Sequence, residues 1–209
     1  NVRDDLKKAA PNKKCTYCGI GTPNTLDHYL PRSTYKIFSI HTHNLIPVCQ
    51  ECNRKKDTLA STNACEQFLH AYFHQLPEST VLYAKLHVLN PGFFFEFSIL
   101  GGNPQWEKTV SRVKFQFSFL NLNDDFQQEA TTFMFDNRVA FEDFFSTDKL
   151  NDHLAQNYLR AIQGYGINHW KTAIWRSLLQ SEDFYKNGKK KIKNRNKKRK
   201  RTPTYKNNT

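Results

Sequence analysis

The sequence predicts an α+β protein with a small N-terminal module, a short antiparallel sheet and a C-terminal helical region. Residues 15–57 are dense in Cys, His, Asn and Pro, residues 81–120 contain β-branched and aromatic runs, and residues 125–185 space apolar positions as helices do. The 209-residue chain is 38% hydrophobic and 14% aromatic, which is enough for a packed core.

Composition divides the chain into four segments. We predict a polar lead-in over 1–14 that is helical or frayed, a chemical module over 15–75 and an accessory β-then-α region over 76–185. Residues 186–209 form a basic, low-complexity tail, and we expect it to be disordered because such a composition cannot bury a core.

The module is expected to contain two brief strands, within Thr25–Leu30 and Asn44–Val48, and a short helix from about Gln50. The apolar spacing over Ala64–Gln75 predicts a further helix, in which Cys65 is a buried residue.

Three strands are predicted next, over Val81–Leu89, Phe93–Leu100 and Val113–Leu120, as a small antiparallel sheet. Alternation is clearest in the last, where four apolar residues share one face. These residues are Val113, Phe115, Phe117 and Phe119.

Three helices are predicted to follow, over about Asp125–Phe145, Lys149–Gln163 and Asn168–Tyr185, with Thr147 as the N-cap of the second. The third carries an apolar stripe. Its members are Trp170, Ile174, Leu178 and Leu179.

Positive charge is concentrated at the two ends. From residue 186 onward there are 12 Lys or Arg and no acidic residue, residues 1–56 carry a net +6, and residues 57–185 carry −6. This distribution indicates a polyanion as partner, bound at the ends of the chain. The acidic middle region suits docking of a protein partner through aromatics that are otherwise core residues. These are Phe93, Phe94, Phe95, Phe144 and Phe145.

Four of the five cysteines form two CxxC pairs, Cys15/Cys18 and Cys49/Cys52. Zinc prefers four thiolates in a tetrahedron, and two CxxC turns supply them. Four thiolates leave no open position, so we predict a structural zinc. The alternative is four unligated small core residues.

The segments TLDHYLPRS and NLIPVCQECNRKK resemble the HNH, or ββα-metal, nuclease family. Its signature is a His at the end of a first strand, an Asn opening a second, and a His or Asn nine residues later on a helix. Asp27-His28, Asn44 and Asn53 match these positions, with the family's flanking cysteines.

The resemblance implies a catalytic role for each matching residue. His28 would take a proton from the attacking water, Asp27 and Asn53 would hold a catalytic divalent ion, Mg²⁺ or Mn²⁺, and Asn44 would orient the hairpin through backbone hydrogen bonds. Adjacent strand residues point to opposite faces, so Asp27 and His28 can act together only where the strand ends or is distorted.

Basic residues near the motif are candidate phosphate contacts, with solvated surface charge as the alternative. They are Arg32, Arg54, Lys55 and Lys56. His41 and His43 flank a loop and are expected to be polar filler. His70 and His74 have the i, i+4 spacing that can bind a metal, but no third ligand or HExxH motif accompanies them, so we expect them to be structural. The tail, for example at Lys190, Lys198 and Arg199, is expected to bind nucleic acid non-specifically, or to act as a nuclear-import signal.

LDHYLPRS, NLIPVC, FLHAYF and NHWKTAIWRSLL also look like the small HNH proteins that bacterial anti-phage systems such as Septu and some retrons pair with an ABC-type ATPase. This resemblance implies a DNA endonuclease licensed by a partner. The alternatives are an RNA-cleaving HNH enzyme and a non-catalytic zinc module that binds nucleic acid. No stretch suits a membrane span or a signal peptide, so we expect a cytoplasmic protein, or a nuclear one in a eukaryotic host.

Overall fold

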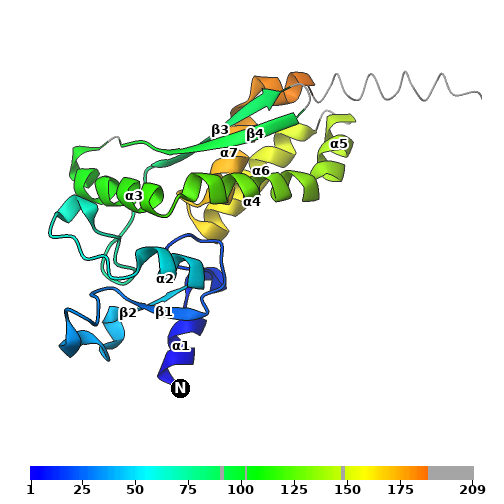
Figure 1. Cartoon of the computed structure of the whole chain (residues 1–209). Helices are drawn as coiled ribbons and strands as arrows, with labels where there is room; N and C mark the ends of the chain where they lie inside the picture. Colours follow the sequence, from blue (N-terminus) through cyan, green and yellow to red (C-terminus); the bar gives the residue numbers. More distant parts are fainter. Residues whose placement is uncertain (90–91, 102, 147–148, 188–209) are drawn as a thin grey trace, which may run out of the picture.

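A computed structural model describes residues 1–89, 92–101, 103–146 and 149–187 of the chain (Figure 1). The α+β class is confirmed. The N-terminal module lies at one end of the molecule, and a β-hairpin packed on helices lies at the other (Figure 1).

The module contains helix α1 (Val2–Lys8), strands β1 (Thr25–His28) and β2 (Leu45–Val48), and helix α2 (Gln50–Lys56). The strands are antiparallel, from the pair Thr25 and Val48 to the pair His28 and Leu45. Cys49 caps α2 through its sulfur, and the helix ends where Asp57 takes a positive φ of 45°. The predicted ββα order is therefore present, with the first strand ending at His28.

The accessory region begins with a hairpin of β3 (Leu82–Leu89) and β4 (Gly92–Ile99), as predicted for its first two strands. Strand β3 packs on α7 (Trp170–Gln180) and β4 on α4 (Leu122–Asp136). Helix α7 also bonds the backbone of β3 directly. The hydroxyl of Ser177 accepts a hydrogen bond from the Leu86 amide at 3.0 Å.

The third predicted strand is wrong, because Val113–Phe119 lies in helix α3 (Glu107–Phe119) and Leu120 is the C-cap of that helix. Phe115 and Phe119 lie one turn apart, and both contact the ring of Phe68, with centroids at 6.1 and 5.6 Å. Aromatic partners pack against more than one side of α3, so its apolar residues do not follow a single helical stripe. The alternating apolar residues of this short segment are therefore compatible with a helix as well as with a strand.

The predicted helix over Ala64–Gln75 is also wrong. Only a 3₁₀ turn, Ala64–Glu66, forms at its start. Beyond this turn the backbone amide of His70 donates a hydrogen bond to Nδ1 of His74 at 2.8 Å. This bond to a side chain replaces the bond to a backbone carbonyl that a helix would make. Cys65 is exposed in this turn and is not the buried helix residue that was predicted.

The helical region contains α4, α5 (Arg138–Ser146), α6 (Leu150–Tyr165) and α7. The single helix predicted over 125–145 is divided at Asn137, whose side chain bonds the Phe133 carbonyl at 2.8 Å and ends α4. Helix α6 is confirmed. Lys149 occupies its N-cap position without a side-chain capping bond, and the predicted cap, Thr147, lies outside the described residues. Helix α7 ends at Gln180, and helical turns resume over 182–187.

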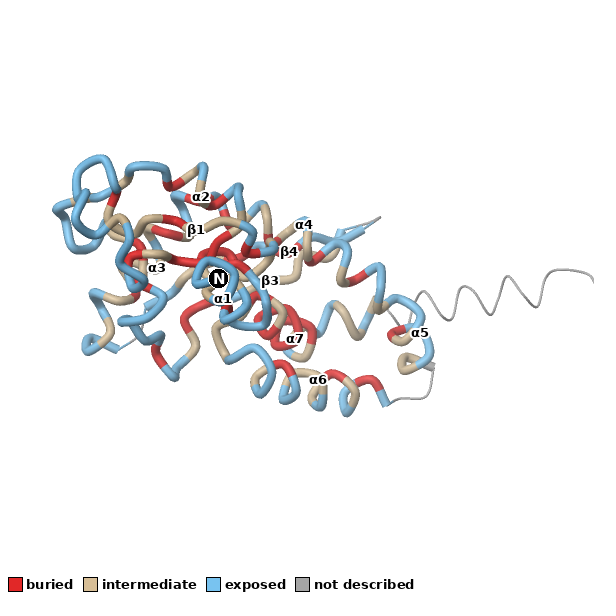
Figure 2. The backbone as a smooth tube through the Cα atoms, turned by 90° about the horizontal axis from the view of Figure 1, so that it is seen from below, coloured by how far each residue is buried: buried red, intermediate tan, exposed pale blue. Residues whose placement is uncertain are grey.

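Helix α7 is buried on most of its faces and lies at the centre of the accessory region (Figure 2). Of the predicted stripe, Trp170, Ile174 and Leu178 are buried, and Leu179 is partly buried. Among the candidate docking aromatics, Phe95 is core, Phe144 and Phe145 pack against the core, and Phe93 and Phe94 are exposed. In the described part of the chain, no helix has the length and apolar character that a membrane span requires.

Candidate HNH active site and zinc cluster

The two CxxC turns bring four sulfurs together, and the four Sγ atoms lie within 4.8 Å of one another. Sγ of Cys18 and Sγ of Cys49 are 3.9 Å apart. A tetrahedral zinc with Zn–S bonds of about 2.3 Å separates its sulfurs by roughly 3.8 Å, so the cluster fits zinc. Cys15 and Cys52 complete the set, and all four residues would be used in one closed, structural site.

Backbone amides support this cluster. Ile20 N–H donates to Sγ of Cys18 at 3.4 Å, and Cys52 N–H donates to Sγ of Cys49 at 3.5 Å. The donor set, the spacing and the amide contacts all suit a bound metal.

His28 is the last residue of β1, and its side chain is half-buried. Its Nε2 lies 3.0 Å from the carbonyl oxygen of Ser39, in the loop that joins β1 to β2. A carbonyl can only accept, so Nε2 carries the hydrogen. In the neutral ring Nδ1 is then the unprotonated nitrogen, which can accept a proton.

Asp27 precedes His28 on β1 and is buried. Its Oδ2 accepts from the hydroxyl of Tyr17 at 2.7 Å and pairs with the ammonium of Lys56 at 2.8 Å. Lys56 also donates to the backbone oxygen of His28 at 3.0 Å. One lysine from α2 therefore bonds both residues of the predicted pair.

Asn53 lies three residues before Lys56 on α2 and is half-buried. Residues three apart share a helix face. Lys56 bonds Asp27 and His28, so Asn53 lies one helical turn from the residue that joins α2 to the predicted pair on β1. The role of Asn53 as a metal ligand stays a prediction.

Asn44 is buried just before β2. Its Oδ1 accepts from the Leu30 amide at 2.7 Å, and its Nδ2 donates to the carbonyls of Leu30 at 3.0 Å and Phe38 at 3.1 Å. These bonds fix both ends of the loop that carries Ser39.

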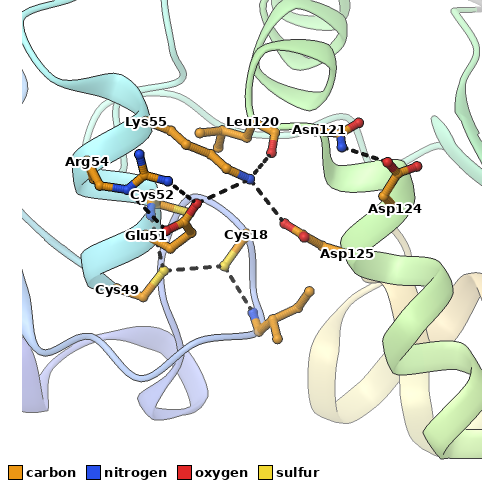
Figure 3. A network of polar contacts seen from close by, with 11 residues as sticks. Cys18, Cys49, Glu51, Cys52, Arg54, Lys55, Leu120, Asn121, Asp124 and Asp125 are labelled. Carbon is orange, nitrogen blue, oxygen red and sulfur yellow. Dashed lines mark hydrogen bonds and ion pairs between the residues drawn. The ribbon is translucent and has the colours of Figure 1, made fainter.

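The four predicted phosphate contacts lie in different surroundings. Arg32 is exposed, while Arg54 is exposed and paired with Glu51 at 2.8 Å. Lys55 reaches the accessory region, where it donates to the Leu120 carbonyl at 2.7 Å and lies 3.7 Å from Asp125 (Figure 3).

Lys56 is buried, so it is not the exposed phosphate contact that was predicted. Burial follows from its two bonds inside the module, to Asp27 and to the His28 backbone. The tail residues Lys190, Lys198 and Arg199 lie outside the described residues.

Two supporting residues were missed from the sequence. Tyr17 lies inside the first CxxC turn, and its buried hydroxyl holds Asp27. Ser39 contributes only a backbone oxygen, which no side-chain pattern reveals. The aromatic residue between two zinc-ligand cysteines was the one available signal, and it is a weak one.

A scan of family models matches residues 15–58 to the HNH endonuclease family. The match covers both cysteine pairs, β1, β2 and α2, so this part of the chain is an HNH endonuclease domain. The resemblance drawn from the sequence is confirmed over this range.

Two curated proteins extend the comparison. Protein ea31 of Escherichia phage lambda is 25% identical over 212 aligned positions, which cover 89% of this chain and 71% of that protein. The Septu protein PtuB of Bacillus thuringiensis is 36% identical over 52 positions, covering 22% of this chain and 20% of PtuB. No solved structure matches the chain.

Proposed function

We propose that this protein is a metal-dependent HNH endonuclease that hydrolyses phosphodiester bonds in DNA, with His28 as the general base. The observation that carries the proposal is the bond between Nε2 of His28 and the Ser39 carbonyl, within a domain of the HNH endonuclease family. That bond orients the ring and leaves Nδ1 as the base.

In the proposed step, water attacks phosphorus while Nδ1 of His28 takes its proton. The new bond joins the water oxygen to phosphorus, the bond to the leaving sugar oxygen breaks, and solvent protonates that oxygen. The fixed ring geometry supports this role because a general base must be positioned before its pKa can matter.

Asp27 and Asn53 are the residues that would hold the divalent ion. A carboxylate and an amide oxygen suit Mg²⁺ or Mn²⁺, and the contacts of Asp27 with Tyr17 and Lys56 both use Oδ2, so Oδ1 takes no part in them. When bound, the ion supplies charge neutralisation at the scissile phosphate and the leaving oxygen. Tyr17 and Lys56 would hold Asp27 in place.

Other residues would support binding of the substrate. Asn44 would hold the loop between β1 and β2 in place through its bonds to the backbone. Arg32 is an exposed cation beside the motif and is suited to contact a phosphate. The basic tail would add non-specific, salt-dependent affinity.

Plasmid nicking tests the proposal. Wild type and His28→Ala, each with its zinc content verified, are compared with Mg²⁺, with Mn²⁺ and with no added divalent ion. We expect metal-dependent nicking that is lost in the variant, by about 100-fold or more. Equal cleavage by both proteins would refute His28 as the base. The same comparison on RNA of matching sequence distinguishes a DNA enzyme from an RNA enzyme.

We further propose that the enzyme is an anti-phage effector controlled by an ABC-type ATPase. The similarity to the Septu protein PtuB supports this role over a short stretch, whereas the similarity to the phage protein covers most of the chain. The acidic accessory region, with Phe93 and Phe94 exposed, is the proposed docking face. Nicking that rises when a candidate ATPase is added would support the role, and nicking unchanged by it would count against it.

A further inference from the structure

A row of rings lies beside the candidate active site and has no part in the roles proposed above. Its members come from the loop over 29–43 and from the segment over 70–76. We name these residues the ring surface: Phe38, His41, His43, Tyr72 and Phe73.

The rings contact one another in series. The centroids of Phe38 and His41 are 6.4 Å apart, and those of His41 and His43 are 5.3 Å apart. His43 stacks on Phe73 at 5.5 Å with an interplanar angle of 29°, and Tyr72 meets His43 edge-on at 6.0 Å. The two segments therefore form one continuous surface.

Much of this surface is open to solvent. Phe73 is 66% exposed, and the loop also presents Ile37 and Ile40, which are 82% and 87% exposed. Large apolar side chains gathered at one place on a soluble protein mark a binding site, because exposing them costs free energy that only a partner recovers.

Charge indicates the kind of partner. No acidic residue occurs between Asp27 and Glu51, and Arg32 and Lys36 are exposed within this interval. Among the described residues, neither cation has a carboxylate within ion-pair distance. Exposed rings and unpaired cations carried by the same loop are features that bind unpaired nucleic acid, since bases stack on rings while cations contact phosphates.

The ring surface is fixed to the catalytic hairpin. The side chain of Asn44 donates to the Phe38 carbonyl at 3.1 Å, and the next residue, Ser39, bonds His28. From the second segment, the hydroxyl of Tyr72 donates to the Leu45 carbonyl in β2 at 2.9 Å. A strand held on these rings is thereby held against the element that carries His28.

We propose that the ring surface stacks unpaired bases, so that the substrate of the HNH site is single-stranded or locally opened DNA. The proposal rests on the nuclease function proposed above. Bases inside a duplex stack on each other and offer no free faces, whereas unpaired bases do. Ile37 and Ile40 extend beyond the rings and suit insertion between separated bases.

Binding without cleavage tests this. Full-length His28→Ala protein, with zinc bound and no added divalent ion, is titrated into labelled single-stranded DNA and into a duplex of the same sequence. We expect tighter binding of the single strand. Adding Ile37→Ser and Phe73→Ala should weaken single-strand binding by about tenfold or more, with a much smaller effect on the duplex.

A matched control replaces two residues of similar exposure on the accessory helices, Val139→Ser and Phe135→Ala, whose side chains are 62% and 67% exposed. This protein should bind single strands as the parent does. A 2-aminopurine base in the strand reports stacking directly, and its fluorescence should be quenched by the parent and recover with Phe73→Ala.

Three results would overturn the proposal: unchanged single-strand binding by the ring variant, tighter binding of duplex by the parent, or an equal loss in the control. If the ring variant binds DNA normally but fails to bind a protein partner, the surface is a protein-docking site. None of these results bears on plasmid nicking, so the nuclease proposal is tested separately.

Discussion

The buried pair of Asp27 and Lys56 is the most unusual feature of the site at the scale of single residues. Both side chains are almost fully enclosed, and their charged atoms are 2.8 Å apart. Enclosed charges are tolerated only when paired and hydrogen-bonded, which Tyr17 and the His28 carbonyl provide. Removing one partner of this pair should therefore lower the free energy of unfolding far more than removing an exposed ion pair.

We predict that Lys56→Met lowers the free energy of unfolding by about 3 kcal/mol or more, because it leaves the Asp27 carboxylate buried without a counterion. Urea unfolding with zinc present measures this. Arg54→Met removes a cation from the same helix, paired with Glu51 at 2.8 Å but exposed, and should cost at most about 1 kcal/mol. The double variant Asp27→Asn, Lys56→Met should regain much of the loss. An equal loss in the free energy of unfolding for the two single variants would show that the buried pair stabilises the fold no more than the exposed pair does.

The sequence motif predicted the cluster of four cysteines, and the four sulfurs do lie together. The catalytic and metal-binding roles of Asp27, His28 and Asn53, which follow from residue type and spacing, stay predictions, and the motif did not show how Asp27 is held. Lys56 was expected at the surface since lysine is rarely buried, and its burial depends on a carboxylate 29 positions away. Such pairing becomes visible only once the strand and helix are packed.

Among the elements, the first zinc knuckle and the start of α2 approach each other closely at Gly21. A Cβ added there would lie 2.6 Å from Cβ of Cys49 and 3.0 Å from its Sγ. Only glycine permits this approach, so the position links the loop before β1 to the ligand that caps α2.

We predict that Gly21→Ala displaces Cys49, lowers zinc affinity at least about tenfold and destabilises the module. Competition with a chromogenic chelator measures the affinity. Gly164→Ala in α6 is the control, because nothing lies within 4 Å of its added Cβ. That change should leave zinc binding intact and stabilise α6 by about 0.5–1 kcal/mol. Unaltered zinc affinity in Gly21→Ala would contradict the packing described here.

Helices and strands were predicted correctly where the spacing of apolar residues was clear within the segment itself. Predictions were wrong where contacts with distant residues determined the secondary structure. The hairpin β3–β4, α6 and the start of α7 follow from their patterns. Helix α3 did not, because its aromatics pack against Phe68 on one side and Phe126 on another. A helix with apolar residues on several faces has no single stripe, and eight residues of alternation do not distinguish it from a strand.

For the molecule as a whole, polar contacts join the HNH module to the accessory region. Lys55 reaches the Leu120 carbonyl, and Gln116 on α3 donates to the Tyr17 carbonyl at 3.0 Å and accepts from the Leu69 amide at 3.0 Å. The residue that holds Asp27 is thus bonded by a helix of the accessory region. We infer that a partner acting on the accessory region would affect the site through these contacts.

His169 lies at this junction and makes stability depend on pH. The side chain of His169 caps α7 by accepting a hydrogen bond from the Lys171 amide at 3.2 Å, and its ring stacks on Tyr165 with centroids 4.7 Å apart. The ring also lies close to Gly19 in the first CxxC turn, since a Cβ added to Gly19 would be 3.5 Å from Nε2 of His169. Burial lowers the pKa of His169 to about 4. An unfolded histidine titrates near pH 6.5. Between about pH 4 and pH 6.5 this histidine is therefore protonated in the unfolded chain and neutral in the folded one.

Stability from this residue should accordingly be complete above about pH 6.5 and fall, by up to about 3 kcal/mol, as the pH drops to about 4. His169→Asn tests this, since asparagine caps a helix well but does not titrate here. The variant should be less stable at neutral pH because the ring contacts are lost, and the difference from wild type should narrow on acidification. Proton competition for the zinc thiolates affects both proteins alike and cancels in that difference. Parallel unfolding profiles from pH 7 to pH 4, measured by urea denaturation, would mean that His169 is protonated as readily in the folded protein as in the unfolded chain.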